Sequence, residues 1–390
     1  MDIRILDYQS TSAAGLNIAA LRDAIDSQSS GLIRNNLEGS ELQTWIGKVS
    51  DVDDLDLGQW QSRNNALADL GYRQGNIESN IELLKQRYEA DRIGLVMGSS
   101  TSSIDRTEEA YCHLEDGGLS SEYQQPLVHN PHAPSLYVAH MSGITGPSIT
   151  INTACSSSAK VFATGARWLN AGLVDAVLVG GVDTLCLSVL HGFDSLQLVS
   201  QNPCKPLDQN RDGINLGEAS GYAILVRADE QHHDVGIRLL GYGESSDAHH
   251  MSHPHPDGLG AKLAMEQALT MASLEPQSID YINLHGTSSR ANDLIEGQLI
   301  STMFPKTTQV SSTKGWMGHT LGAAGITEAL IALDALKRGV IPGSMNLDEL
   351  DHELDVSVSS ANIERDMNYV MSNSFGFGGN NCCLVFGAVS

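Results

Sequence analysis

Two stretches of the chain pass from a β-branched run into a run of Ala, Gly, Ser and Thr. They are "SITINTACSSSAKVFATGA", residues 148–166, and "QVSSTKGWMGHTLGAAGITEA", residues 309–329. A helix with small side chains suits burial between two sheets, because neighbouring backbones can approach it closely. The repetition predicts two structurally similar halves, residues 1–232 and 233–390, with their boundary in the polar run "DEQHHDVG" (229–236).

Strand-like and helix-like segments alternate along the chain. Apolar, β-branched runs predict strands at 92–98, 175–181, 221–228 and 281–286, and apolar residues at three- and four-residue spacing predict helices at 261–274 and 329–339. This alternation indicates an α/β fold. The chain has 390 residues, more than the roughly 250 to 300 at which a single core usually stops growing. Two halves are therefore expected.

The net charge of the chain limits the classes of partner that it is expected to bind. Lys and Arg total 23 against 47 Asp and Glu, a formal charge of −24, which argues against nucleic acid or an anionic membrane as partner. No run of about 18 apolar residues and no signal-peptide core occurs. The six cysteines show no metal-ligand spacing, so we expect reduced thiols in a cytoplasmic protein, with Cys382 and Cys383 buried in a strand.

Cys155 lies between the first β-branched run and the small residues that follow it. A thiol at the start of a helix is near unpaired backbone N–H groups and the positive helix end, which favour the thiolate and suit a nucleophile. A single cysteine is more often a small buried hydrophobic residue. This stretch alone does not separate the two interpretations.

Two glycine-flanked histidines favour the catalytic interpretation. His285 lies in "LHGTSS" and His319 in "STKGWMGHTLGAAG", at an expected strand end and helix start. In "NSFGFGGNN" (373–381), glycines flank Phe377, so the loop can move a ring and aim backbone N–H groups at an oxyanion. The run "HHMSHPHPDG" (249–258) is open to two interpretations, a metal site or, as its prolines favour, a solvent-facing loop.

Taken in order, "TACSSS", "RDG…GE", "HGTSS", "STKGWMGHTLGAAG" and "NSFGFGGNN" resemble the motifs of chain-elongating β-ketoacyl-[acyl carrier protein] synthases over nearly the whole chain. The resemblance implies a thiolase-like, duplicated five-layer α-β-α-β-α fold, a dimer, and a Cys155, His285 and His319 site. It also implies decarboxylative condensation of malonyl-carrier protein with a cysteine-bound acyl chain, in fatty acid, polyketide or polyene biosynthesis. No metal or cofactor is expected beyond the carrier's phosphopantetheine.

The resemblance implies further roles around this site. Lys314 with Glu328 would support the His319 region, although Lys314 by itself could be an ordinary surface residue. The backbone N–H groups of Cys155 and Phe377 would form an oxyanion hole, and the Phe377 ring would gate the acyl pocket.

Partner contacts follow from the same resemblance. Thr287 and Ser289 match positions that bind the pantetheine arm, although turn capping is an alternative for both. Acyl carrier proteins are acidic, so Arg63 and Lys205 are the expected docking cations. The small residues of "GSSTSSIDRTEEAY" (98–111) are expected to form part of the acyl-pocket floor near the dimer interface.

Several departures from the family pattern bear on the pathway. The opening is "DYQSTSAAGLN", Ile214 replaces the aromatic residue after "RDG", "GGNN" replaces "GGTN", and "LQLVSQNPCKPLD" is short. These features favour a specialised polyketide or polyene pathway, such as one for aryl polyenes. Two other functions stay open: a chain-length-factor-like subunit of a ketosynthase heterodimer, and an acyl-CoA-using thiolase-like acyltransferase. The partner subunit is accordingly a second copy or a related chain.

Overall fold

The computed structural model describes residues 3–52, 55–116, 118–228 and 236–389. The predicted boundary between residues 232 and 233 therefore lies outside the described residues. No helix in the described part of the chain combines the length and apolarity needed to cross a bilayer.

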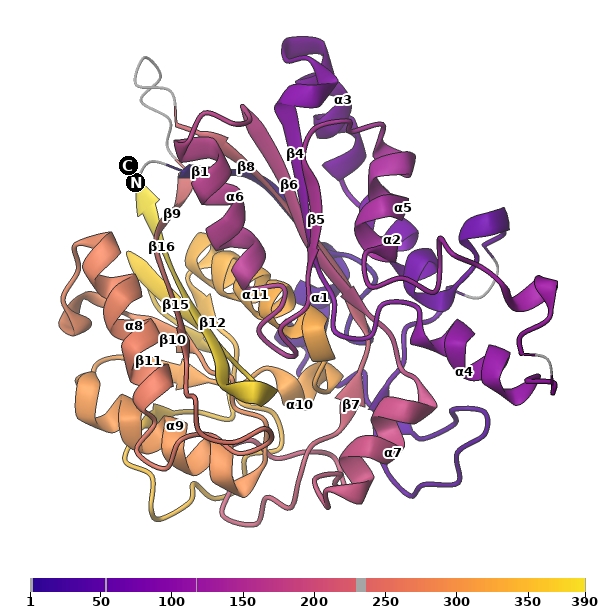
Figure 1. The fold of residues 1–390 in the computed structure, drawn as a ribbon. Helices are drawn as coiled ribbons and strands as arrows, with labels where there is room; N and C mark the ends of the chain where they lie inside the picture. Colours follow the sequence, from indigo (N-terminus) through magenta and orange to yellow (C-terminus); the bar gives the residue numbers. More distant parts are fainter. Residues whose placement is uncertain (1–2, 53–54, 117, 229–235, 390) are drawn as a thin grey trace.

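One mixed sheet shows the predicted duplication, because the strand order of its first half recurs in its second (Figure 1). From the centre outward, the first half contains β1 (Ile3–Ser12), β8 (Ala219–Arg227), β6 (Ala176–Asp183), β4 (Ile93–Gly98) and β5 (Ser148–Ile151). The second contains β9 (Gly236–Ser246), β16 (Asn380–Val389), β15 (Tyr369–Gly376), β10 (Tyr281–Asn283), β11 (Gln309–Ser311) and the added β13 (Ser357–Val358). A short antiparallel pairing of β1 with β9 joins the halves.

Helices cover both faces of each half and form three layers. The middle layer holds α6 (Lys160–Asn170) and α11 (Ala324–Arg338). The outer layers are α2 (Arg63–Arg73), α3 (Ile77–Arg87) and α5 (Ala133–Ser142) on the first half, and α8 (Leu259–Ala272) and α9 (Arg290–Met303) on the second. A separate apolar core lies beneath each helix layer. The predicted five-layer α-β-α-β-α fold is confirmed.

The small residues predicted to allow close approach do so in the middle layer. A Cβ atom on Gly325 would lie only 2.4 Å from the backbone nitrogen of Ala159, so the starts of α11 and α6 pack backbone to backbone. The predicted strands and helices are present, with different ends: β10 stops at Asn283, and α11 begins at Ala324. Cys382 and Cys383 are buried in β16, as predicted.

The remaining elements flank the two halves. They are α1 (Ile18–Asp26), α4 (Ile104–Cys112), α7 (Leu187–Ser195), α10 (Lys314–Met317), and the short strands β2 (Ile33–Arg34), β3 (Trp45–Gly47), β7 (Leu216–Gly217), β12 (Val340–Ile341) and β14 (Ile363–Glu364). The two small sheets are β2-β3-β7 and β12-β14.

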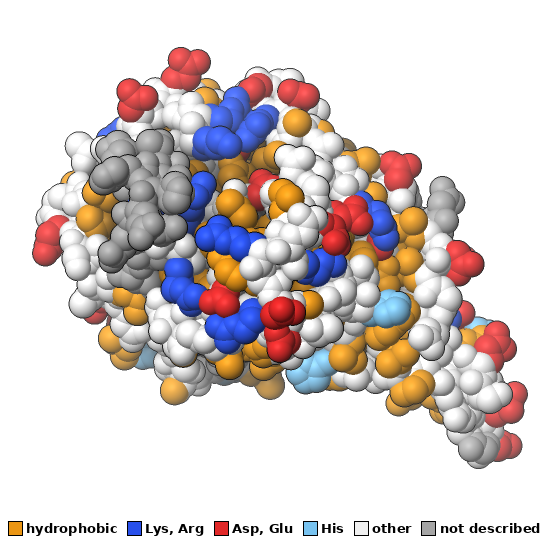
Figure 2. Space-filling model, turned by 90° about the horizontal axis from the view of Figure 1, so that it is seen from above, with side chains coloured by type: hydrophobic (Ala, Val, Ile, Leu, Met, Phe, Trp, Pro, Cys, Tyr) orange, Lys and Arg blue, Asp and Glu red, His pale blue; other side chains and the backbone are white. Residues whose placement is uncertain are grey.

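Basic side chains gather at the end of the molecule that carries the two termini (Figure 2). This end includes the starts of β4 and β6, where Arg92 and Arg227 both pair with Asp175. The carboxyl ends of the parallel strands, where ligands bind in open α/β sheets, lie at the opposite end. The basic end therefore does not face the expected site.

Candidate active site

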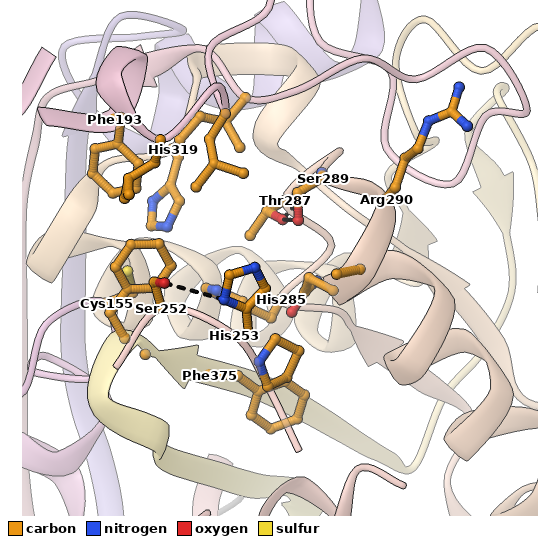
Figure 3. A pocket seen from close by; sticks show the side chains of 18 of the residues that line it. Cys155, Phe193, Ser252, His253, His285, Thr287, Ser289, Arg290, His319 and Phe375 are labelled. Atoms are coloured by element: carbon orange, nitrogen blue, oxygen red, sulfur yellow. Dashed lines mark hydrogen bonds between the residues drawn. The ribbon is translucent and has the colours of Figure 1, made fainter. Parts of the chain in front are cut away.

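A cavity of about 510 Å³ lies at the carboxyl ends of the parallel strands. Both halves contribute to its wall: Cys155 and Phe193 come from the first, and His285, His319 and Phe377 from the second. The three predicted catalytic side chains therefore meet in one space, although up to 164 positions separate them in the sequence. Figure 3 shows the two imidazoles and the thiol around this space.

Cys155 lies in the turn that connects strand β5 to helix α6 and not at the first residue of the helix. Strand β5 ends at Ile151 and α6 begins only at Lys160, so the predicted position of the helix start is wrong by several residues. Ala154 has a φ of +52°, a left-handed conformation that is strained for alanine. Such strain is common where a fold must fix a functional side chain, and here it fixes the neighbouring thiol.

The charge state of Cys155 differs from the prediction. Burial raises the pKa of the thiol to about 11, although the Lys314 charge and a hydrogen bond from the Phe377 backbone N–H both lower it. The residues between Cys155 and α6 already form a turn, in which the Lys160 N–H donates to the Ser156 carbonyl at 3.2 Å, but the start of this turn does not offset the effect of burial. The thiol is therefore protonated at neutral pH and must lose its proton during the reaction.

The two histidines are neutral and close to the thiol. The Cys155 sulfur and one nitrogen of each ring lie within 4.8 Å of one another, and the ring planes cross at 85°. Burial, followed by the Lys314 charge, lowers the pKa of both His285 and His319 well below the usual value. Each ring is therefore neutral at neutral pH and offers one N–H donor and one acceptor nitrogen.

Hydrogen bonding fixes the tautomer of one ring. The Leu321 backbone N–H donates to Nδ1 of His319 at 3.1 Å, so the neutral ring carries its proton on Nε2. Nδ1 of His285 is buried and has no hydrogen-bond partner among the described residues. A buried polar atom of this kind suggests a substrate contact.

A thiol with two imidazoles is also a donor set that Zn²⁺ accepts, so the metal-free reaction stays a prediction.

Lys314 and Glu328 lie behind the histidines and are both almost completely buried. The Lys314 ammonium donates to Glu328 and to the backbone carbonyl of His285. Burial raises the pKa of Glu328 to about 7 against the opposing effect of Lys314. The pair thus holds the His285 backbone directly, whereas the sequence predicted support for the His319 region.

Glu296 also positions His285, and the sequence interpretation missed it. Its carboxylate accepts hydrogen bonds from the backbone N–H groups of His285 (2.9 Å) and Gly286 (2.8 Å), and from the Asn373 side chain (3.1 Å). Glu296 lies on α9 and is 1% exposed. A carboxylate about two helix turns after "HGTSS" was the available signal, since a buried charge needs partners.

The Phe377 loop contacts both the thiol and another aromatic ring. The Phe377 backbone N–H is close enough to the Cys155 thiol to lower its pKa, which places this N–H beside the predicted oxyanion position. The Phe377 ring packs against Phe193 of α7, with 5.3 Å between ring centroids. Gly378 has a φ of +76°, and its N–H donates to the Met251 carbonyl at 2.7 Å. Gating by Phe377 stays a prediction.

Thr287 and Ser289 line the cavity, and their hydroxyls are 2.9 Å apart. The Ser289 backbone N–H donates to Thr287 at 3.3 Å, so turn capping is also present. The Ser289 side chain, however, does not cap α9, although Ser289 is its N-terminal cap residue. Both roles fit this geometry, and binding of the pantetheine arm stays a prediction.

The two predicted docking cations are already paired. Arg63 binds the buried Glu218 at 2.5 Å, and its side chain is only 14% exposed. Lys205 binds Asp348 at 2.6 Å and is 31% exposed. Neither lines the cavity. The Arg63 charge neutralises a buried carboxylate and the Lys205 charge is paired at the surface, so carrier-protein docking at these two residues stays a prediction that the structure does not support.

Two further segments lie differently from expectation. None of residues 98–111 lines this cavity, and Ser99, Ser100 and Thr101 instead donate hydrogen bonds to the buried Asp183. Their role as a pocket floor stays a prediction. Residues 249–258 form the predicted loop, with His250 and His253 exposed. The loop also contributes residues 252–254 to the cavity wall, which the sequence interpretation missed.

The buried thiol predicts how alkylation depends on pH. Because the pKa of Cys155 is about 11, the reactive thiolate fraction should rise about tenfold per pH unit from 7 to 10. Iodoacetamide labelling of Cys155, followed by peptide mass spectrometry, should therefore accelerate over this range without levelling. Levelling near pH 7 would show an activated thiolate instead. The exposed Cys112 serves as an internal reference.

Comparison with known proteins places these features in context. The model of the β-ketoacyl synthase N-terminal domain matches residues 50–231, and that of the C-terminal domain matches residues 237–348. The 3-oxoacyl-[acyl-carrier-protein] synthase 2 of Vibrio harveyi is 32% identical over 359 residues, which cover 86% of each chain. The mitochondrial 3-oxoacyl-[acyl-carrier-protein] synthase of Arabidopsis thaliana is 32% identical over 376 residues, covering 90% of this chain and 81% of that one.

A solved structure gives a similar result. A chain in the complex of a ketosynthase with its chain length factor from Xenorhabdus doucetiae matches with a TM-score of 0.88 and 35% identity. The match covers 99% of this chain and 98% of that one.

Proposed function

The chain belongs to the β-ketoacyl synthase family of acyltransferases, and on that premise we propose that Cys155, His285 and His319 carry out its condensation reaction. An acyl chain is transferred from an acyl carrier protein to the Cys155 sulfur. A malonyl-carrier protein then loses carbon dioxide, and the resulting carbanion attacks the Cys155 thioester to form the new carbon–carbon bond. The observation that carries this proposal is the meeting of one thiol and two neutral imidazoles within 4.8 Å.

The thiol and the loop beside it suit the first half-reaction. Cys155 is protonated at neutral pH, and a neutral imidazole within 4.8 Å can accept its proton as the sulfur attacks the thioester. The thioester oxygen becomes negative in the intermediate. The Phe377 backbone N–H, which already contacts the sulfur, can donate to that oxygen together with the Cys155 N–H.

The two imidazoles suit the second half-reaction. Loss of carbon dioxide leaves negative charge on the malonyl thioester oxygen, and hydrogen-bond donors stabilise that charge most in a buried site. The fixed tautomer of His319 supplies one donor at Nε2. His285 supplies a second, and its backbone is held by Lys314 and Glu296. No step requires a metal or an organic cofactor.

The chain retains every group that a silent chain-length-factor subunit would be expected to lose. Cys155, His285 and His319 are all present and lie in one cavity, which favours the catalytic subunit over the silent one.

Strand β5 forms an edge of the large sheet, and its Ile149 is 38% exposed. An unpaired apolar edge favours strand addition, so β5 is the proposed contact with a second copy or a related subunit. We place the protein in the cytoplasm.

The pathway is tested by substrate choice. The specialised polyene interpretation predicts that polyenoyl-carrier proteins are elongated at least as fast as saturated ones of equal length, with a related subunit added where needed. The measurement is mass spectrometry of the carrier-bound products, with acyl-CoA thioesters as a parallel donor. Efficient elongation of saturated chains alone would indicate an ordinary fatty acid synthase. Elongation supported by acyl-CoA and not by carrier protein would indicate the thiolase-like alternative.

A further inference from the structure

The described part of the cavity wall carries one basic and two acidic side chains. Among the described residues that line the cavity, Arg290 is the single Lys or Arg, and Asp212 and Asp247 are the two carboxylates. Arg290 is exposed, and its guanidinium makes no hydrogen bond or ion pair with the described residues. An unpaired arginine is unusual beside a cavity in a chain of charge −24, where nearby carboxylates are plentiful.

The backbone of Arg290 is fixed although its side chain is free. Arg290 is the first residue of α9, and its carbonyl accepts a hydrogen bond from the buried Arg211 at 3.3 Å. Arg211 is in turn held by Asp351 at 2.5 Å. In Figure 3 the Arg290 side chain lies on the far side of Thr287 and Ser289 from Cys155, and it is exposed. The guanidinium therefore marks the outer end of a path that leads past two hydroxyls to the thiol.

We propose that the Arg290 guanidinium binds the phosphate of the phosphopantetheine arm that delivers the substrate. This inference rests on the proposed function, in which the arm's thiol end must reach Cys155 while its phosphate end stays at the surface. Arginine presents a planar pair of N–H donors that matches two phosphate oxygens. The carboxylates of Asp212 and Asp247 would otherwise repel that phosphate at the cavity wall.

The first turn of α9 also favours an anion beside Arg290. Arg290, Ala291 and Asn292 all line the cavity and are the first three residues of the helix. The backbone N–H groups of a first helix turn favour an anion. Ser289 precedes them, and its hydroxyl is not used to cap the helix. The Arg290 side chain supplies the full charge, and the helix start supplies additional donors.

Binding measurements test the proposal without requiring catalysis. Calorimetry would give dissociation constants for 4′-phosphopantetheine and for pantetheine, which differ only in the phosphate. The wild-type protein should bind the phosphorylated compound about tenfold more tightly, as expected for one charge-assisted pair at a partly exposed site. In Arg290→Ala this ratio should fall to about one, and Arg290→Lys should recover part of it, because it keeps the charge and loses the fork.

The matched control is Arg87→Ala, which removes an exposed arginine of α3 that does not line the cavity and should leave the tenfold ratio in place. A phosphate preference that persists in Arg290→Ala, or that is missing from the wild type, would overturn the proposal. Failure of the proposed function looks different: Cys155 would remain unacylated by every thioester tested, whatever the binding ratios.

In acyl-CoA the pantetheine phosphate is part of a diphosphate, whereas on a carrier protein it is a diester, so an acylation assay with both donors shows which of them uses Arg290. The Arg290→Ala substitution should lower kcat/KM about tenfold for whichever donor the protein uses, relative to its kcat/KM with acyl-pantetheine. Equal losses for both donors would support recognition of the pantetheine phosphate that they share, and no loss with either donor would overturn it.

Discussion

Replacing Cys155 with alanine is expected to abolish acyl transfer to the protein and to lower condensation by at least about 10⁴-fold, because no other group can form the thioester. The fold should survive, since the substitution removes a single buried sulfur next to Ala154 and should cost about 1 kcal/mol of stability. Intact-protein mass spectrometry after incubation with acyl-carrier protein measures the acyl transfer.

The matched control for this prediction is Cys112→Ala, which removes the exposed thiol of α4. It should leave the acyl-enzyme mass unchanged. A Cys155→Ala protein that still gains the acyl mass would show that the nucleophile has been misassigned.

Replacing His285 or His319 with alanine should separate the two half-reactions. Each variant should still become acylated at Cys155, because either imidazole can accept the thiol proton within the 4.8 Å cluster. Condensation should fall by about 10²- to 10³-fold for each, the usual cost of removing one hydrogen-bond donor from a developing oxyanion. The two rates are measured by intact-protein mass and by release of labelled carbon dioxide from malonyl-carrier protein.

His352→Ala supplies the control for both histidine variants, because its side chain is 77% exposed and does not line the cavity. It should change neither rate. If both active-site variants lost acylation as well as decarboxylation, the proposed division of labour between thiol and imidazoles would be wrong.

Much of this architecture could be predicted from local sequence. The small-residue helices identified the middle layer because packing between two sheets requires close backbone approach, as at Gly325 and Ala159. The three proposed catalytic positions could be singled out because thiols and imidazoles beside glycine-rich turns are rare outside functional sites. The duplicated order of the two half-sheets confirmed the repeat that the sequence had suggested.

The properties that failed to follow from the sequence depend on distant partners. The pKa of Cys155 is raised by burial against residues from both halves, whereas the local pattern suggested a lowered value. Arg63 looked like a surface cation, but it neutralises Glu218, 155 positions later in the chain. Arg290 directly follows the predicted arm-binding Ser289, but its exposure and its lack of a partner among the described residues follow only from the fold.

The most direct test of the central claim is a single-turnover reaction of Cys155-acylated protein with malonyl-carrier protein whose free carboxylate is isotopically labelled. The proposed mechanism predicts that labelled carbon dioxide and a carrier-bound β-ketoacyl chain, two carbons longer, appear together as the acyl mass leaves Cys155. Loss of the acyl group without a longer carrier-bound product, or a longer product formed by the Cys155→Ala protein, would contradict it.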